Sequence, residues 1–393
     1  MADYPILRLK PERDSSVKNR HHAIYRTAFE TPPDVPNGSI AEIRSSDDEF
    51  LCYATINTRA YISGRAIAFE QGDPLVTLRR TFKRAIDMRQ QFFSSAETTA
   101  YRLINAEGDG IPGLIVDRYN DIVVLQFTTL GMDKLRPWVI NTIADLCAPK
   151  AIYEKSTGAN RKNEGLEPRE QWLRGSGDTT MEVRENGLRF KISLTSGQKT
   201  GLFLDQRDMR SLVRSISAGR TVLDCCSYVG GFALSAMMGG AAAADAVDYD
   251  PAAIVLAKEH ATLNGFDAEQ FGAYEEDVFD FLRRSPLPRA YDFIILDPPA
   301  FAKGDADLDL AKHKYTDMNR MAMQALPSGG LLLTCSCSYQ INPEIFQTIV
   351  FHAARQTGRS VRILQRHHQA YDHPVNIYYP ETDYLKSLLL WIE

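Results

Sequence analysis

Cysteine is scarce in this 393-residue chain, and the few thiols follow no regular spacing. The cysteines are at positions 52, 147, 225, 226, 335 and 337. They are too few for a disulfide framework. The sequence has no paired C-x-x-C motifs, so a structural zinc site is not expected. We therefore expect neither disulfides nor a bound metal. The default interpretation of each cysteine is a buried small apolar side chain.

Long apolar runs are also missing, since no stretch approaches the roughly 20 residues that a membrane helix needs. The composition, 44% hydrophobic and 24% charged residues, is that of a soluble globular protein. The first residues, Met1-Ala2-Asp3-Tyr4-Pro5, show no basic region followed by an apolar one, so no secretory signal is predicted. We expect a cytoplasmic protein with no membrane partner.

Excess positive charge is missing too, because the net charge is −5, so any polyanion must bind at a local patch. The best candidate is a predicted helix, LRRTFKRAIDMRQQFF (78–93). Its basic residues are Arg79, Arg80, Lys83, Arg84 and Arg89. Apolar residues at helical spacing dock one side of this helix, so the basic residues are predicted to face outward. A solvated helix face and a phosphate-contacting surface, formed by the first four, explain the pattern equally well.

Length and changing pattern together indicate more than one domain. Residues 1–74 hold short β-rich runs separated by turn-forming residues, which predicts a small β barrel. Its expected strands are near 39–44, 50–57 and 60–69. The first domain is therefore predicted to be all-β.

A second pattern follows in residues 75–190, where helices and strands are mixed. Helices are expected over 75–94 and 132–147, and the stretch TGANRKNEGLEPREQ (157–171) has the composition of a mobile polar loop. This region is predicted to be an α+β module.

From 191 to 393, apolar strands alternate regularly with helical patterns. The strands are TVLDCC, AAADAVDYD, QFGAYEED, YDFIILDPP and GGLLLTCSCS. This alternation predicts an α/β fold, a Rossmann-like doubly wound sheet of parallel strands joined by crossover helices. A ligand is expected at the carboxyl ends of the strands.

The first of these strands ends in Asp224 and runs into a glycine-rich turn, CCSYVGGF (225–232), before a helix. Such a turn lets backbone N–H groups approach a ligand closely, and either a dinucleotide or S-adenosylmethionine can sit on it. The spacing is not G-x-G-x-x-G, and a carboxylate at the strand end repels a pyrophosphate but attracts a sulfonium or an amine. The pattern favours the methyl donor, S-adenosylmethionine.

Two further acids follow the next two strands. Asp248, 24 residues after Asp224, is suited to accept hydrogen bonds from both ribose hydroxyls. Asp277 is predicted to lie where an adenine amino group would be, although helix capping also explains it. Asp250, directly before Pro251, is interpreted as a helix N-cap.

The fourth strand leads into Asp297-Pro298-Pro299 at the same predicted edge. Two prolines cannot continue a strand ladder, so they can form the wall of a base-sized slot, although a simple strand-terminating turn is the alternative. Asp297 can hydrogen-bond a heterocycle presented edge-on, and Phe301 can stack on it. The fifth strand then brings two thiols, Cys335 and Cys337 in LLLTCSCSYQ, to this edge, and their spacing lets both point to one face.

The motifs GQKTGLFLDQRD (197–208), VLDCCSYVGGFA, LDPPAF and TCSCS together define a family pattern. With them, the chain resembles the RNA 5-methylcytosine methyltransferases of the large ribosomal subunit that carry an N-terminal PUA domain. YRLINAEGDGIPGLIVDRY (101–119), NEGLEPRE (163–170), DHPV (372–375) and YPETDYLK (379–386) also match, so the similarity covers nearly the whole chain.

The resemblance implies a cofactor, a substrate, a nucleophile and an oligomeric state. The cofactor is S-adenosylmethionine, with S-adenosylhomocysteine as product, and the substrate is ribosomal RNA. The implied cofactor-binding residues are Gln206, Arg207, Asp224, Ser227, Tyr228, Gly230, Asp248, Asp277 and Asp297. The implied nucleophile is Cys337, although Thr334-Cys335-Ser336 also mimics the motif of other RNA cytosine methyltransferases. A homodimer with a PUA-like barrel is implied as well.

Methylation at carbon 5 explains why a thiol is needed. Carbon 5 of cytosine is a poor nucleophile, and a thiolate that adds at carbon 6 makes the ring an enamine able to attack the donor methyl. Loss of the carbon-5 proton then expels the cysteine. The thiol pKa, ordinarily near 8.5, must be lowered by positive potential or polar donors. Asp297 is the candidate for polarising the ring, with the target base flipped out of its stack.

Three positions depart from the family pattern or carry a second interpretation. Arg20-His21-His22-Ala23 stands where relatives commonly have Arg-His-Pro-Trp, and Ala300 stands where some have lysine after Asp-Pro-Pro. His373 in DHPV is interpreted as a structural histidine rather than a pocket residue.

Other functions also fit parts of the sequence. Some relatives with Asp-Pro-Pro-x-Phe methylate guanine N7 without a cysteine, which Cys337 argues against. An RNA-binding assembly factor with a vestigial donor fold is opposed by the intact set of acids. A nicotinamide oxidoreductase is opposed by the missing pyrophosphate fingerprint.

Overall fold

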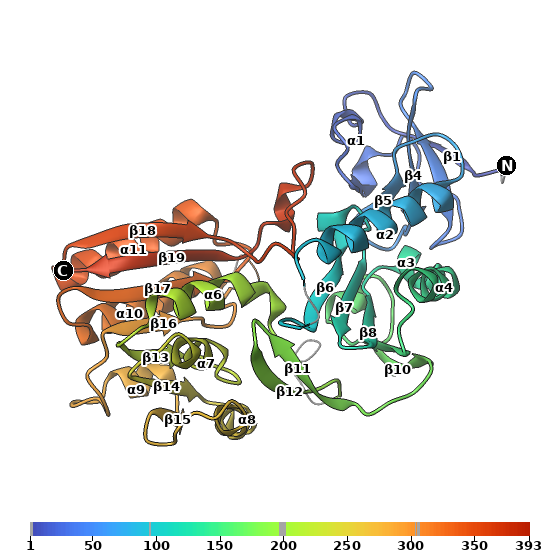
Figure 1. The fold of residues 1–393 in the computed structure, drawn as a ribbon. Helices are drawn as coiled ribbons and strands as arrows, with labels where there is room; N and C mark the ends of the chain where they lie inside the picture. Colours follow the sequence, from blue (N-terminus) through green and yellow to red (C-terminus); the bar gives the residue numbers. More distant parts are fainter. Residues whose placement is uncertain (1–2, 94–95, 196–201, 303, 305–306) are drawn as a thin grey trace. The chain divides into compact units, whose positions relative to one another are not determined.

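The computed structural model describes residues 3–93, 96–195, 202–302, 304 and 307–393 (Figure 1). These residues fall into two compact units. Unit 1 is Met1–Val183, Ile192–Leu204 and Tyr371–Thr382, and unit 2 is Arg184–Lys191, Asp205–Ala370 and Asp383–Glu393. Each unit is built from separated parts of the chain. The predicted domain boundaries at 74/75 and 190/191 stay predictions.

The first sheet of unit 1 has the strand order β1-β3-β4-β5-β2. Its elements are β1 (Ile6–Arg8), α1 (Ser15–Lys18), β2 (Ala23–Tyr25), the short 3-10 helix η1 (Arg26–Ala28), β3 (Ile40–Arg44), β4 (Phe50–Ile56) and β5 (Ile62–Ala68). Beyond β1 and β2, Lys10 N–H donates to Ala28 O at 2.8 Å and Glu30 N–H to Arg8 O at 2.9 Å. These bonds join the two edges, so the sheet curls into a barrel. The predicted strands near 39–44, 50–57 and 60–69 are confirmed within two residues.

The second sheet of unit 1 has the strand order β10-β9-β8-β7-β6. Its elements are α2 (Pro74–Gln90), β6 (Ala100–Asn105), the 3-10 helix η2 (Ala106–Asp109), β7 (Leu114–Tyr119), β8 (Ile122–Phe127), α3 (Leu130–Lys134), α4 (Arg136–Cys147), β9 (Ala151–Ser156), α5 (Asn160–Asn163) and β10 (Arg169–Arg174). Helix α2 starts where Asp73 accepts a hydrogen bond from Leu75 N–H at 2.8 Å. Its apolar face, including Leu78, Phe82 and Ile86, is buried against the sheet. The α+β interpretation is confirmed.

The prediction that 157–171 is a mobile polar loop is wrong. Helix α5 and strand β10 occupy much of this stretch. The Arg161 side chain is buried, and its guanidinium donates to the carbonyl oxygens of Phe127 and Glu167. These bonds satisfy a buried charge with backbone acceptors, so the segment is tied to the sheet.

The prediction that Arg89 faces outward with the rest of the basic helix is also wrong. Its side chain is 0% exposed and forms a two-pronged ion pair with Asp109 at 2.6 and 2.7 Å. It also donates to the carbonyls of Arg102 and Asp372, at 3.0 and 2.7 Å. Spacing on the helix placed Arg89 near the basic stripe, but remote acceptors draw it inward.

Unit 2 is built on a sheet with the strand order β15-β14-β13-β16-β17-β19-β18. Its strands are β13 (Thr221–Cys225), β14 (Ala243–Asp248), β15 (Phe271–Glu275), β16 (Phe293–Leu296), β17 (Gly330–Ser336), β18 (Val361–His367) and β19 (Lys386–Ile392). β15 through β17 are parallel, while β19 runs antiparallel to both β17 and β18. The predicted α/β fold is confirmed, and β18 and β19 are additions that the sequence analysis missed.

Helices join these strands, and they pack in layers. They are α6 (Arg207–Ile216), which follows the 3-10 helix η3 (Leu204–Gln206), α7 (Gly231–Met238), α8 (Pro251–Leu263), α9 (Val278–Leu282), α10 (Leu308–Ala325) and α11 (Pro343–Thr357). One sheet face, with Leu223, Ile294 and Leu332, forms a core with α9, α10 and α11. Asp250 caps α8 as predicted, accepting from Ala252 N–H at 2.9 Å.

The remaining elements are the hairpin β11 (Thr180–Glu185) and β12 (Leu188–Ser193), and a 3-10 helix, η5 (Pro380–Thr382). Across the part of the chain that is described, no helix is both long and apolar enough to traverse a bilayer. Each of the cysteines is a thiol rather than half of a disulfide.

Candidate active site

The parallel strands of unit 2 end at a common edge. Cys225 pairs with Val247 on one side and with Leu296 on the other, and Leu296 pairs with Thr334. Residues just beyond these positions therefore meet at one rim of the sheet. The predicted residues at this rim are Asp224, Asp248, Asp277, Asp297 and Cys337.

The turn after β13 has an unusual backbone. Cys226, Tyr228 and Gly230 have φ angles of 59°, 49° and 77°. These alternating left-handed residues fold the turn back on itself, and Ser227 N–H and Gly230 N–H donate to Val247 O and Ser227 O at 3.0 and 2.9 Å. A Cβ on Gly230 would lie 3.2 Å from Ala257 Cβ, so glycine also allows α8 to pack closely.

Asp224 is fully buried beneath this turn. One carboxylate oxygen, Oδ2, accepts from Ala233 N–H at 3.0 Å, while the other, Oδ1, finds no hydrogen-bond partner among the residues that the structure describes. Burial raises the pKa of Asp224 to about 8, and the nearby carboxylates of Asp297 and Asp248 add to the shift. The Arg210 guanidinium offsets only part of this rise in pKa. A buried acid with an unsatisfied oxygen is costly, which indicates a site that a cation completes.

Gln206 and Ser227 also carry unsatisfied polar atoms. Gln206 Oε1 and Ser227 Oγ are buried, and neither has a partner among the described residues. Together with Asp224 Oδ1 they offer acceptors for an ammonium group and polar partners for a carboxylate. The amino-acid end of S-adenosylmethionine has both groups, so these residues fit the predicted donor.

Asp248 and Asp277 differ in how much of their hydrogen-bonding capacity is already used. Asp248 accepts from Tyr228 N–H at 2.8 Å and from Asp250 N–H at 3.0 Å, and it is 8% exposed. Asp277 is the N-cap of α9, where one oxygen accepts from Phe279 N–H at 2.8 Å. The capping interpretation of Asp277 is therefore correct, and within the described ranges its second oxygen accepts no such bond.

Gln206 links the donor side of the rim to the turn after β16. Its Nε2 donates to Asp297 Oδ1 at 2.8 Å, and Asp297 N–H reaches Cys225 O at 3.3 Å. Arg207 is buried at the start of α6, with its Nε 3.5 Å from Glu185. Of the matching string 197–208, residues 197–201 lie outside the described residues.

The two candidate thiols have different surroundings. Cys335 lies within β17 and is 0% exposed, and burial together with the Asp297 carboxylate raises its pKa well above the ordinary value. Cys337 lies past the end of the strand, where alternation no longer fixes its direction. It is partly exposed, with Sγ 3.9 Å from Pro298 O. Only Cys337 of the pair is accessible beside the Asp-Pro-Pro turn.

A hydrogen-bonded frame holds the Cys337 segment. Tyr315 on α10 is fully buried, and its hydroxyl lies 3.1 Å from both Ser336 Oγ and Ser338 Oγ. Lys386 on β19 donates from Nζ to Ser338 O at 2.7 Å. The sequence analysis assigned no role to Tyr315 or Lys386, although the motif YPETDYLK that ends in Lys386 was part of the resemblance.

The remaining predicted wall residues form the side next to Cys337. Pro298 is buried and Pro299 is exposed. The Phe301 ring packs edge-on against Tyr315, with centroids 4.8 Å apart, and Lys314 Nζ lies 5.4 Å from the Phe301 centroid. Ala302 N–H also donates to Ser338 Oγ at 3.4 Å, so the wall contacts the thiol segment and the residue that holds it.

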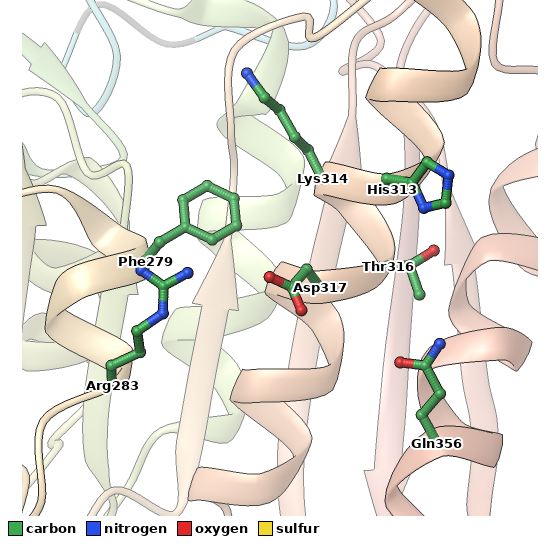
Figure 2. Close-up of a pocket in the computed structure, with 7 residues that line it drawn as sticks. All are labelled: Phe279, Arg283, His313, Lys314, Thr316, Asp317 and Gln356. Carbon is green, nitrogen blue, oxygen red and sulfur yellow. The ribbon is translucent and has the colours of Figure 1, made fainter.

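A separate hollow of ≈ 400 Å³ lies over α9, α10 and α11 (Figure 2). Figure 2 shows its lining side chains, with Lys314 directed away from Gln356. The lining residues are Phe279, Arg283, His313, Lys314, Thr316, Asp317 and Gln356. None of the predicted cofactor-binding residues lines it.

In unit 1, most of the predicted basic helix is already neutralised. Arg79, Arg80 and Lys83 form ion pairs with acids at 3.4, 2.7 and 2.7 Å. Arg84 has no carboxylate partner among the described residues and lines a hollow of ≈ 180 Å³ together with Arg20. The cationic potential of this face therefore concentrates at the two arginines.

One departure from the family pattern, Arg20-His21-His22-Ala23, lies in unit 1 together with His373, whereas Ala300 lies in unit 2. His21 stacks on Tyr379, with centroids 4.3 Å apart, and buried His22 is bonded through Nδ1 to Ala66 O at 2.7 Å. His373 is buried, and its Nδ1 lies 2.9 Å from Asp372. The structural interpretation of His373 is supported by this bond.

Comparison with known proteins gives the class and then the family. A family model described as S-adenosylmethionine-dependent methyltransferase matches residues 162–388, and one described as PUA-like domain matches residues 7–69. A crystal structure of a methyltransferase complexed with SAH covers 98% of this chain and 99% of that chain, at 25% identity and TM-score 0.85. A SAM-dependent methyltransferase from Streptococcus mutans covers the same shares, at 25% identity and TM-score 0.83. The fold and the site thus define an S-adenosylmethionine-dependent methyltransferase.

Curated relatives along the full length narrow this class. Ribosomal RNA large subunit methyltransferase I of Alteromonas mediterranea is 35% identical over 385 residues, 97% of both chains. The proteins of the same name from Aeromonas salmonicida and Tolumonas auensis are 36% identical, covering 96% and 97% of this chain and 97% and 98% of theirs. The chain belongs to the ribosomal RNA large subunit methyltransferase I family, which confirms the resemblance.

Proposed function

We propose that this enzyme forms 5-methylcytosine in large-subunit ribosomal RNA through a covalent adduct of Cys337 with carbon 6 of the target base. The observation that carries the proposal is the accessible thiol of Cys337 beside the Asp297-Pro298 turn, at the rim where the unsatisfied Asp224 lies. The names of the full-length relatives support the choice of RNA.

The donor would be held by residues of the rim. Asp224 Oδ1 and Gln206 Oε1 are the free acceptors for its ammonium group, and Ser227 Oγ is a polar partner for its carboxylate. Asp248 and Asp277 are the acceptors for the ribose and the adenine. When bound, S-adenosylmethionine supplies an electrophilic methyl group.

The chain's own residues would carry out the covalent steps. The Cys337 thiol loses its proton, and the sulfur electron pair forms a bond to carbon 6 of the flipped cytosine. Carbon 5 thereby gains the electron density that it needs to accept a methyl group. When the carbon-5 proton leaves, its electron pair reforms the ring double bond and the sulfur–carbon bond breaks.

Asp297 is the proposed partner of the cytosine ring, through N3 or N4. Gln206 holds one oxygen of Asp297 at 2.8 Å, which orients the carboxylate before the base arrives. Pro298, Pro299 and Phe301 would form the wall of the slot. Because cytosine N3 and N4 form a specific edge, this contact also favours cytosine over uracil.

RNA would also be bound by basic residues of unit 1. Three of the predicted cations, Arg79, Arg80 and Lys83, have acidic partners that RNA phosphates must displace. For Arg84 and Arg20, the described part of the chain supplies no acidic partner. We propose these two arginines as the main phosphate contacts of unit 1. A homodimer and a cytoplasmic location are proposed from the family resemblance alone, and light scattering of the purified chain tests the first.

Trapping of the covalent adduct tests the proposed reaction. RNA in which 5-fluorocytidine replaces cytidine cannot release the enzyme after methylation, because carbon 5 has no proton to lose. With S-adenosylmethionine present, we expect a protein–RNA complex that survives a denaturing gel. Cys337→Ala removes it, and Cys335→Ala is the matched control that retains it.

Each other outcome points to a different conclusion. If Cys335→Ala abolishes the complex and Cys337→Ala retains it, the nucleophile is Cys335. If neither wild type nor variants form an adduct while methyl groups still enter RNA, the enzyme acts on another position, such as guanine N7. If the protein fails to bind S-adenosylmethionine in calorimetry, it is an RNA-binding assembly factor.

A further inference from the structure

We propose that Lys386 is a positioning residue for the nucleophile, holding the Cys337 segment and placing an ammonium group where the thiolate forms. This inference rests on the proposed function for its biological meaning, but its chemistry is testable without RNA. The Lys386 ammonium would also supply the positive potential that a cysteine nucleophile needs at neutral pH.

Strand pairing brings Lys386 next to the thiol segment. In the antiparallel pair of β17 and β19, Lys386 lies opposite Ser336, the residue before Cys337. Lys386 Nζ then donates to Ser338 O, the residue after Cys337, at 2.7 Å, and to Tyr384 O at 2.8 Å. The lysine therefore contacts the chain on both sides of the nucleophile.

The ammonium group is buried without an opposite charge. Lys386 is 6% exposed, and among the described residues no carboxylate lies within ion-pair distance of it. Burial lowers the pKa of Lys386 to about 8, while Cys337 acts in the opposite direction. Because the coupling is mutual, a cation that Cys337 stabilises also stabilises the Cys337 thiolate.

Other ionisable groups around Lys386 do not supply this charge. Asp383 precedes the strand and favours the ammonium form. Burial lowers the pKa of His367, which lies on the neighbouring β18, and so keeps it neutral. Tyr315 on α10 is uncharged because burial raises its pKa to about 12. Asp297, at the end of β16, opposes ionisation of a nearby thiol, so Lys386 is the cation that offsets it.

The proton balance is simple. The Cys337 proton passes to water, Lys386 remains an ammonium ion, and the freed sulfur electron pair attacks carbon 6. When the thiolate leaves at the end of the reaction, the same ammonium stabilises it again. Above the pKa of Lys386 the ammonium loses its proton, and the thiolate loses this electrostatic support. The activation of Cys337 by Lys386 is therefore confined to pH values at which Lys386 is still charged.

Alkylation of the full chain without RNA measures this effect directly. The rate of Cys337 modification by iodoacetamide is followed from pH 5 to 10 by peptide mass spectrometry. Removing a partly buried charge near a thiol raises its pKa by about 1 unit or more. We therefore expect the midpoint of Cys337 alkylation in Lys386→Met to lie at higher pH than in wild type, by that amount.

A second variant separates charge from position. Lys386→Gln keeps an N–H donor for Ser338 O but no charge, so its midpoint should rise like that of Lys386→Met. Lys258→Met on the exposed side of α8 is the matched control and should leave the midpoint unchanged. Cys147, which lies in unit 1, is the internal reference in every sample.

The outcomes distinguish this inference from the proposed function. Equal midpoints for wild type, Lys386→Met and Lys386→Gln overturn the role of Lys386, even if the enzyme makes 5-methylcytosine. A raised midpoint in both variants, with no 5-fluorocytidine adduct in wild type, supports Lys386 and overturns the proposed reaction. If the alkylation midpoint rises in Lys386→Met but not in Lys386→Gln, the effect comes from the lost hydrogen bond, and the proposed electrostatic role of Lys386 is refuted.

Discussion

Replacing Asp224 by asparagine should make the protein more stable at neutral pH while weakening its binding of S-adenosylmethionine. Asp224 is fully buried, and one of its oxygens has no partner. Its pKa rises from 3.8 to about 8 on folding. The stability that this group contributes is therefore fully present below pH 3.8 and is lost as the pH rises through about 8.

The size of the effect follows from the shift. Each pH unit between the two pKa values removes ~1.4 kcal/mol, so the carboxyl group costs about 5 kcal/mol at pH 8 and about 2 kcal/mol at pH 5. Asparagine avoids ionisation, but it buries an amide N–H group without an acceptor, which costs about 2 kcal/mol. We expect Asp224→Asn to match wild type near pH 5 and to be about 3 kcal/mol more stable at pH 8.

Hydrogen exchange of the buried amides in β13 and β14 measures this difference within unit 2. Comparing variant and wild type at the same pH cancels the intrinsic exchange rates. Asp309→Asn is the matched control, because that side chain is 89% exposed and should leave exchange unchanged. Calorimetry should show S-adenosylmethionine binding at least tenfold weaker in Asp224→Asn, because the ammonium loses its carboxylate.

The reasoning is refuted if the stability difference does not widen between pH 5 and pH 8, or if Asp224→Asn is the less stable protein at pH 8. Either result would mean that Asp224 is ionised and satisfied in the free enzyme. It would then be a structural acid, and the argument that a cation completes the site would fail.

Two further predictions concern the thiol frame and the RNA contact. Tyr315→Phe removes the hydroxyl that contacts both Ser336 and Ser338. We expect kcat to fall about tenfold, while the KM for S-adenosylmethionine stays constant. An unchanged kcat would exclude a positioning role for Tyr315. Arg84→Ala should weaken RNA binding and lower the salt slope of log K by about 1, as expected for one lost phosphate contact. Its neighbour Lys83, already paired with Asp87, should give a smaller change when replaced by alanine, and the reverse order would contradict the assignment.

The fold of unit 2 could be predicted because its signals are local. Alternating apolar strands and helices imply parallel pairing, and an acid at a strand end is visible in the sequence itself. Helix capping by Asp277 was also visible, as an aspartate directly before an amphipathic run. Such features depend on neighbours within a few residues.

The missed features depend on partners far along the chain. Lys386 reaches the thiol segment only because β19 returns beside β17, about 50 residues after it. Arg89 is predicted from its helical spacing to face outward, because nothing near it in the sequence indicates its contacts with Asp109 and the carbonyl of Asp372. The burial of Cys335 and the partial exposure of Cys337 likewise depend on where β17 ends.

Unit 1 has a consequence for how the protein is made. Its segment Tyr371–Thr382 lies between β18 and β19 in sequence, and Asp372 in that segment accepts a hydrogen bond from Arg89. During synthesis on the ribosome, unit 1 therefore cannot be completed until nearly the whole chain has emerged. Only then can the buried Arg89 form its hydrogen bond to Asp372 O. A nascent chain that stops after residue 195 leaves that unit incomplete and exposed to proteolysis.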